Sequence, residues 1–213
     1  MNLPVIIIGA GGHARVLISV LKARKMDILG ITERALNKVG EGISGISILG
    51  QDDIILNYLP DSILLVNGIG STESAANRES IFKKFKNSGY TFASAIHHSA
   101  LIMEDVKLGE GVQIMAGAII QPGCVIGDNS IINTGAIIDH DCMIGDHVHV
   151  APGAVLSGGV HIGSKAHIGT AAAVIQGKSI GAGAIIGAGA VVIEDIPERT
   201  KVVGVPARLM ERR

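Results

Sequence analysis

The chain has 213 residues, of which 29 are glycine, only 2% are aromatic and none is tryptophan. This length allows one large domain or two small ones, and a core of small aliphatic residues is typical of thin, regular layers. The formal net charge of −1 gives no reason to expect binding to nucleic acid or to an anionic membrane surface.

The N-terminus carries no targeting signal that the sequence patterns would reveal. No basic segment precedes the apolar run Val5–Ile8, and this run is too short for a signal peptide or a membrane span. We therefore expect a cytoplasmic protein.

The first part of the chain alternates between strand and helix patterns. The expected elements are a strand at Val5–Ile8, a helix with Val16, Leu17, Val20 and Leu21 on one face, a strand at Ile28–Ile31, a helical stretch at Gln51–Tyr58, a strand at Ile63–Val66 and a charged helix at Glu73–Asn87. This βαβ alternation predicts a small parallel sheet, so residues 1–92 should form an α/β domain that resembles half of a Rossmann domain.

A glycine-rich turn, Gly9-Ala10-Gly11-Gly12-His13-Ala14, joins the first strand to the first helix. It is close to the dinucleotide fingerprint G-x-G-x-x-A, and Glu33 stands near the place of the acid that binds ribose. Three interpretations stay open: a nucleotide-sugar site, a structural turn and an NAD site. A full NAD site uses two βαβαβ halves, and the segment before Ile96 offers space for about one, which favours a smaller nucleotide held by the amides of the helix N-terminus.

A repeat of six residues fills the second part of the chain. Every sixth position is aliphatic, namely Ile96, Ile102, Leu108, Ile114, Ile120, Ile126, Ile132, Ile138, Ile144, Val150, Leu156, Ile162, Ile168, Val174, Ile180, Ile186 and Val192. A period of six excludes an amphipathic helix and predicts short strands whose inward side chains are these residues. Glycine often follows the aliphatic residue, and we expect it to relieve φ restrictions in the turn.

Three such units make a triangular coil of eighteen residues, and about five coils fit between Ile96 and Val192. Residues 93–213 should therefore form a parallel β-helix with a C-terminal tail. In such a coil, residues eighteen apart lie one above the other. His140 should lie beneath Gly158, and Cys124 beneath Cys142 as small core residues.

His140 is the candidate general base, because it should point outward at a corner and Asp141 follows it. One coil above, Gly158 and Gly159 offer backbone amides without a side chain, and such an amide can stabilise an oxyanion. His149 is also expected to point outward. The sequence has no CxxC and no His/Cys ligand spacing, so we expect no metal site.

Two stretches, Asn133–Cys142 and Ile144–Ala154, resemble the active-site region of hexapeptide-repeat acyltransferases, in particular the sialic-acid O-acetyltransferases and the bacterial nucleotide-amino-sugar N-acetyltransferases. The turn Gly9–Ala14 and the tail Val203–Arg208 add to the likeness, which covers almost the whole chain. The resemblance implies a left-handed β-helix and homotrimers with active sites between neighbouring subunits. It also implies acetyl-CoA as co-substrate and no metal.

The resemblance also implies a role for individual residues. The catalytic group would be His140 as the base, Asp141 beside it and the Gly158 amide on the thioester oxygen. Acetyl-CoA would be bound by His149, Gly158, Gly159, Thr170 and Ala188. The nucleotide sugar would be bound by Gly9, Gly11, Gly12, His13, Glu33 and Asn133.

The most specific expectation is N-acetylation of a nucleotide-linked 4-amino-4,6-dideoxy sugar in surface-glycan biosynthesis. Two alternatives stay open: O-acetylation of sialic acid or a related sugar, and a non-catalytic β-helix that binds a partner. The chain departs from the family at Ile31-Thr32-Glu33-Arg34, where paired aspartates are common. This departure leaves the sugar and the nucleotide, UDP, GDP or dTDP, open.

Overall fold

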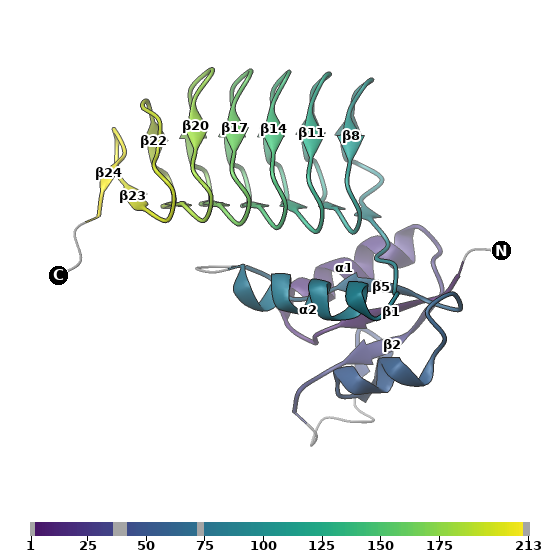
Figure 1. Ribbon diagram of the computed structural model, residues 1–213. Helices are drawn as coiled ribbons and strands as arrows, with labels where there is room; N and C mark the ends of the chain where they lie inside the picture. The colour runs from purple at the N-terminus through teal and green to yellow at the C-terminus, as the bar shows by residue number, and fades with distance from the viewer. Residues whose placement is uncertain (1–2, 36–41, 72–74, 211–213) are drawn as a thin grey trace. The chain divides into compact units, whose positions relative to one another are not determined.

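A computed structural model of the protein describes residues 3–35, 42–71 and 75–210. The chain divides into two compact units, the first made of Met1–Gly70 and Asn77–His98 and the second of Ser71–Ala76 and Ser99–Arg213 (Figure 1). The division predicted from the sequence, residues 1–92 and 93–213, concerns the function of each part and stays a prediction. No helix within the described ranges is long and apolar enough to span a membrane.

The first unit is built on a five-stranded sheet with the order β3-β4-β2-β1-β5. Its strands are β1 (Val5–Ile8), β2 (Ile28–Thr32), β3 (Gly42–Ile43), β4 (Ile46–Gly50) and β5 (Leu64–Asn67). The central strand β1 pairs in parallel with β2 and β5, and its four residues are fully buried. The predicted parallel sheet is confirmed. The antiparallel pair β3–β4 was not predicted.

Two α-helices and a 3₁₀ helix complete the first unit. They are α1 (Gly12–Ala23), a 3₁₀ helix at Asp52–Asn57 and α2 (Ala76–Asn87), and the short strand β6 (Ala95–Ile96) follows. The predicted apolar face of α1 is wrong at Val16, which is 43% exposed, because the buried face turns toward Ile18 instead. The predicted start of the last helix, Glu73, lies outside the described residues.

The second unit is a stack of short strands, nearly all of two residues (Figure 1). Three parallel sheets form its faces. The first contains β7 (Leu101–Ile102), β10 (Ile119–Ile120), β13 (Ile137–Ile138), β16 (Val155–Leu156), β19 (Ala173–Val174) and β22 (Val191–Val192). The second contains β8 (Lys107–Leu108), β11 (Val125–Ile126), β14 (Met143–Ile144), β17 (His161–Ile162) and β20 (Ser179–Ile180). The third includes β9 (Gln113–Ile114), β12 (Ile131–Ile132), β15 (His149–Val150), β18 (His167–Ile168), β21 (Ile185–Ile186) and β23 (Lys201–Val203). At its end β24 (Arg208–Leu209) pairs with β23 in the antiparallel direction.

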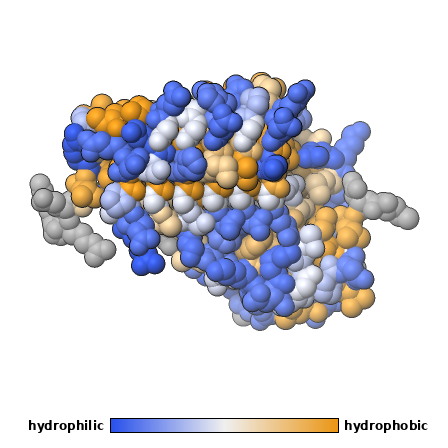
Figure 2. Space-filling view, turned by 45° about the horizontal axis from the view of Figure 1, so that its top comes forward, coloured by the Kyte–Doolittle hydropathy of each residue, from blue (hydrophilic) through white to orange (hydrophobic). Residues whose placement is uncertain are grey.

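The register between neighbouring strands is eighteen residues, as in the pairs Ile120↔Ile138 and Ile138↔Leu156. The predicted triangular coil and the count of about five coils are therefore confirmed. In the space-filling view, residues of like hydropathy line up in rows along this stack (Figure 2).

Aliphatic side chains of the six-residue repeat fill the interior of the stack. From Ile114 to Val192 each of them is at most 3% exposed. The prediction that all of them lie inside is wrong for Ile96, Ile102 and Leu108, which are partly exposed. Ile102 and Leu108 belong to the first coil of the stack, which has a coil of the repeat on one side only.

The glycine that follows many of these aliphatic residues has a role different from the predicted one. Left-handed φ values occur two residues later, for example at Gly123 (φ 76°) and Asn129 (φ 54°). Gly127 and Gly145 are needed instead for close stacking. A β-carbon on Gly127 would lie 2.6 Å from the carbonyl carbon of Gly145, and one on Gly145 would lie 2.7 Å from the Ser164 nitrogen.

We predict that a substitution of an inward-pointing residue destabilises the β-helix far more than one of an outward-pointing residue in the next strand of the chain. Ile138 is fully buried, so Ile138→Ala should lower the free energy of unfolding by about 2–5 kcal/mol through lost burial and a cavity. Ile138→Asp should prevent folding, because it buries an unpaired charge. Met143→Ala, at a residue that is 43% exposed, is the control and should cost about 0.5 kcal/mol or less. Equal losses in denaturant unfolding would contradict this arrangement of the core.

Candidate active site

Apart from His149, which lies in β15, the predicted site residues of the second unit lie at two corners of the β-helix. The base corner comprises residues 139–142 and 157–160, the turns that follow β13 and β16. The far corner comprises residues 133–136, 169–172 and 187–190, the turns that follow β12, β18 and β21. These corners border opposite edges of the sheet that contains β13.

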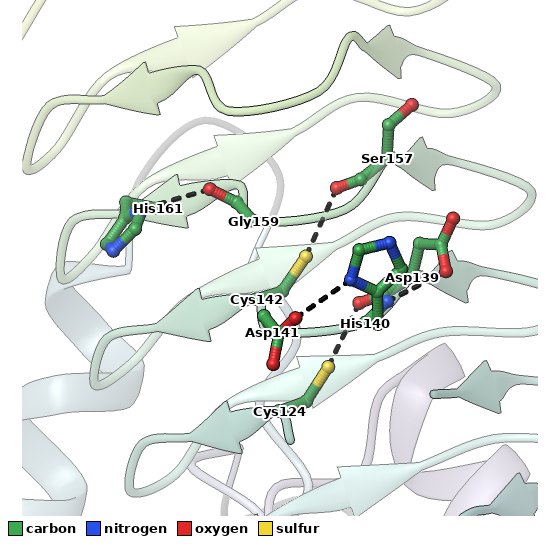
Figure 3. Close-up of polar contacts among 8 residues, drawn as sticks. All are labelled: Cys124, Asp139, His140, Asp141, Cys142, Ser157, Gly159 and His161. Atoms are coloured by element: carbon green, nitrogen blue, oxygen red, sulfur yellow. Dashed lines mark hydrogen bonds and ion pairs between the residues drawn. The ribbon is translucent and has the colours of Figure 1, made fainter. Parts of the chain in front are cut away.

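His140 and Asp141 form a hydrogen-bonded pair at the base corner (Figure 3). The distance from His140 Nδ1 to Asp141 Oδ2 is 2.9 Å, and the two side chains are 54% and 74% exposed. The predicted outward position of His140 is therefore confirmed. An ionised carboxylate can only accept a hydrogen bond, so Nδ1 carries the ring proton and donates a hydrogen bond to Asp141. In the neutral ring, Nε2 is then the hydrogen-bond acceptor.

Acidic neighbours tune this histidine. The hydrogen bond to Asp141 raises the pKa of His140 above its ordinary value of 6.5, desolvation opposes the shift, and the charges of Asp139 and Asp141 add to it. Asp139 also accepts the backbone N–H of His140 through Oδ1 at 2.8 Å (Figure 3). Asp139 was not singled out from the sequence, although it stands next to the base.

Gly158 lies directly against the reactive edge of the imidazole. A β-carbon on Gly158 would lie 2.5 Å from His140 Nε2 and 2.6 Å from Cε1. The predicted stacking of His140 and Gly158 is therefore confirmed, and it requires glycine at residue 158. Among the described residues, the Gly158 N–H donates to no protein acceptor.

The neighbouring amide of Gly159 is already used within the fold. It donates to the His140 carbonyl oxygen at 2.8 Å and so joins the two coils. Of the two amides that the sequence offered as oxyanion donors, the one at Gly158 is free to serve. The role predicted for Gly159 in acetyl-CoA binding stays a prediction. Because its N–H is already bonded, acetyl-CoA would have to occupy the open space where a side chain would otherwise stand.

A second glycine, not predicted, supports the pair from the coil below. A β-carbon on Gly123 would lie 2.5 Å from Asp141 Oδ1, so the carboxylate occupies the space that this glycine leaves. Asp141 itself has a left-handed φ of 59°, which aspartate tolerates better than most residues do. The signal was present in the sequence, because Gly123 precedes Asp141 by one coil.

His149 points outward from the coil, as predicted, since Val150 is the inward residue of β15, but its side chain is covered. It is 9% exposed, Nδ1 contacts the carbonyl oxygen of Ser71, and Nε2 lies 3.0 Å from Asn133 Nδ2. Because a carbonyl only accepts, Nδ1 donates to Ser71 and Nε2 accepts from Asn133. His149 also contacts His167 edge to face, with ring centroids 5.0 Å apart. Its contact with acetyl-CoA stays a prediction, and both ring nitrogens already have protein partners.

Three further predicted residues belong to the far corner. Asn133 accepts the Thr134 N–H at 2.8 Å in addition to its bond with His149. Thr170 and Ala188 are exposed and lie one coil apart, and the Gly189 N–H donates to the Thr170 carbonyl oxygen at 2.8 Å. Within one chain, the structure does not bring these residues together with His140, because the sheet that contains β13 separates the two corners.

In the first unit, the predicted substrate residues gather at the C-terminal ends of the parallel strands. Gly9 follows β1 with a φ of 91°, and its N–H donates to the Thr32 carbonyl oxygen at 3.1 Å. Gly11 caps α1, and β-carbons on Gly11 or Gly12 would meet no atom within 4 Å. The first turn of α1 contains no acidic residue. This turn is therefore open and favourable for an anion.

Glu33 lies at the same edge of the sheet, since Ile8 pairs with Thr32 in the strand before it. Its carboxylate accepts the Ala35 N–H at 3.3 Å. Asp52, which the sequence did not single out, accepts a hydrogen bond from the Thr32 hydroxyl at 2.5 Å and adds a second acid at this edge. Its position there depends on the pairing of β2 with β4.

No group of three or more His, Cys, Asp or Glu side chains within the described ranges could hold a metal ion. A groove runs along the outer face of the sheet that contains β14, lined by Met143, His161 and Ser179 among others. None of the predicted site residues lines it.

Comparison with known proteins agrees with this architecture. A model of the bacterial transferase hexapeptide (six repeats) matches residues 105–140 and 123–158, and a model of the PglD N-terminal domain matches residues 4–85. A comparison with curated proteins gave no match.

Several solved structures are similar over nearly their whole length. PerB from Caulobacter crescentus, in complex with CoA and GDP-perosamine, is 36% identical with a TM-score of 0.89, and 99% of each chain is covered. The acetyltransferase domain of PglB from Neisseria gonorrhoeae FA1090, in complex with acetyl coenzyme A, is 31% identical with a TM-score of 0.91, over 99% of this chain and 100% of that one. WeeI from Acinetobacter baumannii AYE is 27% identical with a TM-score of 0.87, over 98% of this chain and 100% of that one.

The fold is thus an α/β domain followed by a left-handed β-helix, as in these structures. The chain belongs to the hexapeptide-repeat acetyltransferases, the family that includes perosamine N-acetyltransferase and the acetyltransferase domain of PglB.

Proposed function

We propose that the protein transfers the acetyl group of acetyl-CoA to the amino group of a nucleotide-linked 4-amino-4,6-dideoxy sugar, in surface-glycan biosynthesis. The observation that carries the proposal is the position of His140 Nε2, an acceptor that Asp141 holds against Gly158, whose N–H donates to no acceptor among the described residues. The similarity to PerB, whose structure holds CoA and GDP-perosamine, supports the same substrate class. We further propose that the reaction takes place in the cytoplasm.

In the proposed reaction, the sugar amine attacks the thioester carbon and a tetrahedral intermediate forms. The Gly158 N–H stabilises the oxyanion, a contribution that is large where the donor is fixed in advance. His140 Nε2 accepts the proton from the attacking nitrogen, and Asp141 stabilises the resulting imidazolium. The C–S bond then breaks, and the proton passes from His140 to the leaving CoA thiolate.

For the nucleotide sugar we propose residues 1–92, and for acetyl transfer residues 93–213. The open amides at Gly11 and Gly12 would receive a phosphate, with His13 beside them. Glu33 would contact the nucleoside, and Asp52 lies near enough to the same edge to take part. Asn133, whose amide hydrogen-bonds to His149, stays a candidate for substrate binding in the second unit.

The direct test is an assay of acetyl transfer from acetyl-CoA to GDP-, UDP- and dTDP-linked 4-amino-4,6-dideoxy sugars. The reaction is monitored by the release of the free thiol of CoA. Mass spectrometry should show an amide on one of these sugars. An ester on sialic acid or a related sugar, with no amide product, would favour the O-acetyltransferase instead. Absence of acetyl-CoA binding, measured by calorimetry, would favour a non-catalytic binding module.

We further propose a homotrimer with active sites shared between subunits. The sheet that contains β13 has an outward row that is apolar from end to end, consisting of Leu101, Ile119, Ile137, Val155, Ala173 and Val191. If three such faces surround one axis, the base corner of each subunit meets the far corner of a neighbour. Thr170 and Ala188 of one subunit would then complete the acetyl-CoA site at His140 of another.

Replacement of the base should separate chemistry from binding. We predict that His140→Ala lowers kcat by roughly 10²–10⁴-fold, the usual contribution of a general base, with little change in acetyl-CoA affinity. Since only neutral His140 accepts a proton, kcat/KM should rise with pH through a pKa above 6.5. Asp141→Asn removes the main cause of the raised pKa, so this limb should move to lower pH with a smaller loss of kcat. A wild-type pH profile without this limb would contradict the role of His140.

Gly158→Ala offers a sharper test of the stacking. The backbone of Gly158 does not need a left-handed φ, so alanine is tolerated, but its β-carbon would displace the imidazole. We predict a loss in kcat of roughly 10²-fold, as for other small misplacements, and a nearly unchanged melting temperature. Ser157→Ala in the same turn adds no atom near His140 and is the matched control. Full activity of Gly158→Ala would show that the ring position is unimportant.

The proposed interface predicts the outcome of a single charge substitution. Ile137→Glu, in the apolar row, should convert the trimer to monomers in light scattering, because it would bury a carboxylate between subunits. It should abolish activity as well, since each site needs two subunits. Val125→Glu, an outward position in the sheet that contains β14, should leave the trimer intact. A wild-type monomer at micromolar concentration would rule out the shared site.

A further inference from the structure

An arginine lies buried in the first unit, on α2. Arg78 is 1% exposed, and its Nη1 donates to the carbonyl oxygens of Asn67 at 2.9 Å and Ile69 at 2.8 Å. The Asn67 side chain returns a hydrogen bond to the Arg78 carbonyl oxygen at 3.0 Å and accepts the Ile69 N–H at 3.2 Å. These bonds fasten residues 67–70, here called the flanking loop, to the first turn of α2.

The flanking loop lies directly against the glycine-rich turn. The Gly68 N–H donates to the Ile8 carbonyl oxygen at 2.8 Å, and a β-carbon on Gly9 would lie 3.2 Å from Ile69 Cγ1. At the start of α1, a β-carbon on Gly70 would lie 3.5 Å from His13 Cβ. A shift of the flanking loop by a fraction of an ångström would therefore change the space beside Gly9 and His13.

Holding a loop with a buried charged side chain costs free energy, because the charge is removed from water. Burial lowers the pKa of Arg78 to about 9, so the guanidinium is still protonated near neutral pH. An apolar residue of similar size would avoid the cost of burying the charge, yet it would leave the carbonyls of Asn67 and Ile69 without these donors. The buried cation also adds positive potential to a region where the first turn of α1 has no acidic residue.

We propose that Arg78 is a positioning residue for the nucleotide sugar, acting through the flanking loop on the turn Gly9–His13. This inference rests on the proposed function, in which that turn receives the substrate phosphates. The residue touches no reacting atom in this scheme, so its loss should weaken binding of one substrate and leave the chemistry at His140 intact.

The experiment is steady-state kinetics on the full-length protein, with whichever nucleotide-linked amino sugar of the panel turns over fastest. Arg78→Met should raise KM for the sugar roughly 10- to 100-fold, as expected for a misplaced binding loop, without a change in kcat or in KM for acetyl-CoA. Arg78→Lys, which keeps the charge and one donor group, should restore part of the loss. Should Arg78→Met fail to fold, Arg78→Lys alone must show the rise in KM for the sugar.

Two further variants separate the possible explanations. Phe85→Leu perturbs the buried face of the same helix and should lower the melting temperature without raising KM for the sugar. If it raises KM as much as Arg78→Met does, general instability explains the effect and the inference is wrong. Gly11→Leu should raise KM for the sugar by blocking the turn itself.

The same data distinguish the two proposals. If Gly11→Leu leaves KM for the sugar unchanged, the turn does not bind the nucleotide and the proposed function of the first unit fails. If Gly11→Leu raises KM while both Arg78 variants leave it unchanged, the function stands and the role of Arg78 is refuted. If neither Arg78 variant folds, the arginine holds the domain as a whole, and that result also contradicts a positioning role.

Discussion

Close backbone stacking of eighteen-residue coils is the constraint on which the rest of the β-helix depends. Each coil hydrogen-bonds to the next, as Ile137 does to Ala154 and Gly159 to His140, and glycines such as Gly127 leave the space that the next coil fills. Because the register between coils is fixed, residue 140 lies one coil below Gly158, and the Asp141 side chain then orients the imidazole. The proposed base and the Gly158 amide are thus placed by the same contacts that stabilise the fold.

The first unit positions its residues by another route. Parallel strands end at one edge of the sheet, and this edge collects Gly9, Glu33 and the flanking loop from three separate segments. No repeat fixes their spacing, so hydrogen bonds such as those of Arg78 and Thr32 set the local geometry. The local geometry of this edge therefore depends on a few buried polar groups, whereas the corners of the β-helix are set by the repeat.

Sequence periodicity was sufficient for the β-helix and for the pairing of His140 with Gly158, because both follow from counting residues along one coil. Periodicity did not predict contacts between residues that are distant in the sequence, nor contacts that depend on local backbone geometry. Nothing near His149 indicates that Ser71, 78 residues away, covers it. The amide of Gly159 could not be distinguished from that of Gly158 without the coil hydrogen bonds. In α1, Val16 and Ile18 are both aliphatic, and tertiary packing determined which is buried.

The location of His140 and Gly158 on successive coils also limits which insertions and deletions the β-helix can accept. Removing one six-residue unit between His140 and Gly158 would rotate everything beyond it by one face and carry the glycine to another edge of the prism. Adding a whole coil beyond Ala188, in contrast, would preserve the pair and the residues proposed for acetyl-CoA, and it would alter only the height of the stack. Within the β-helix, insertions should therefore be tolerated best in multiples of eighteen residues on the C-terminal side of His140.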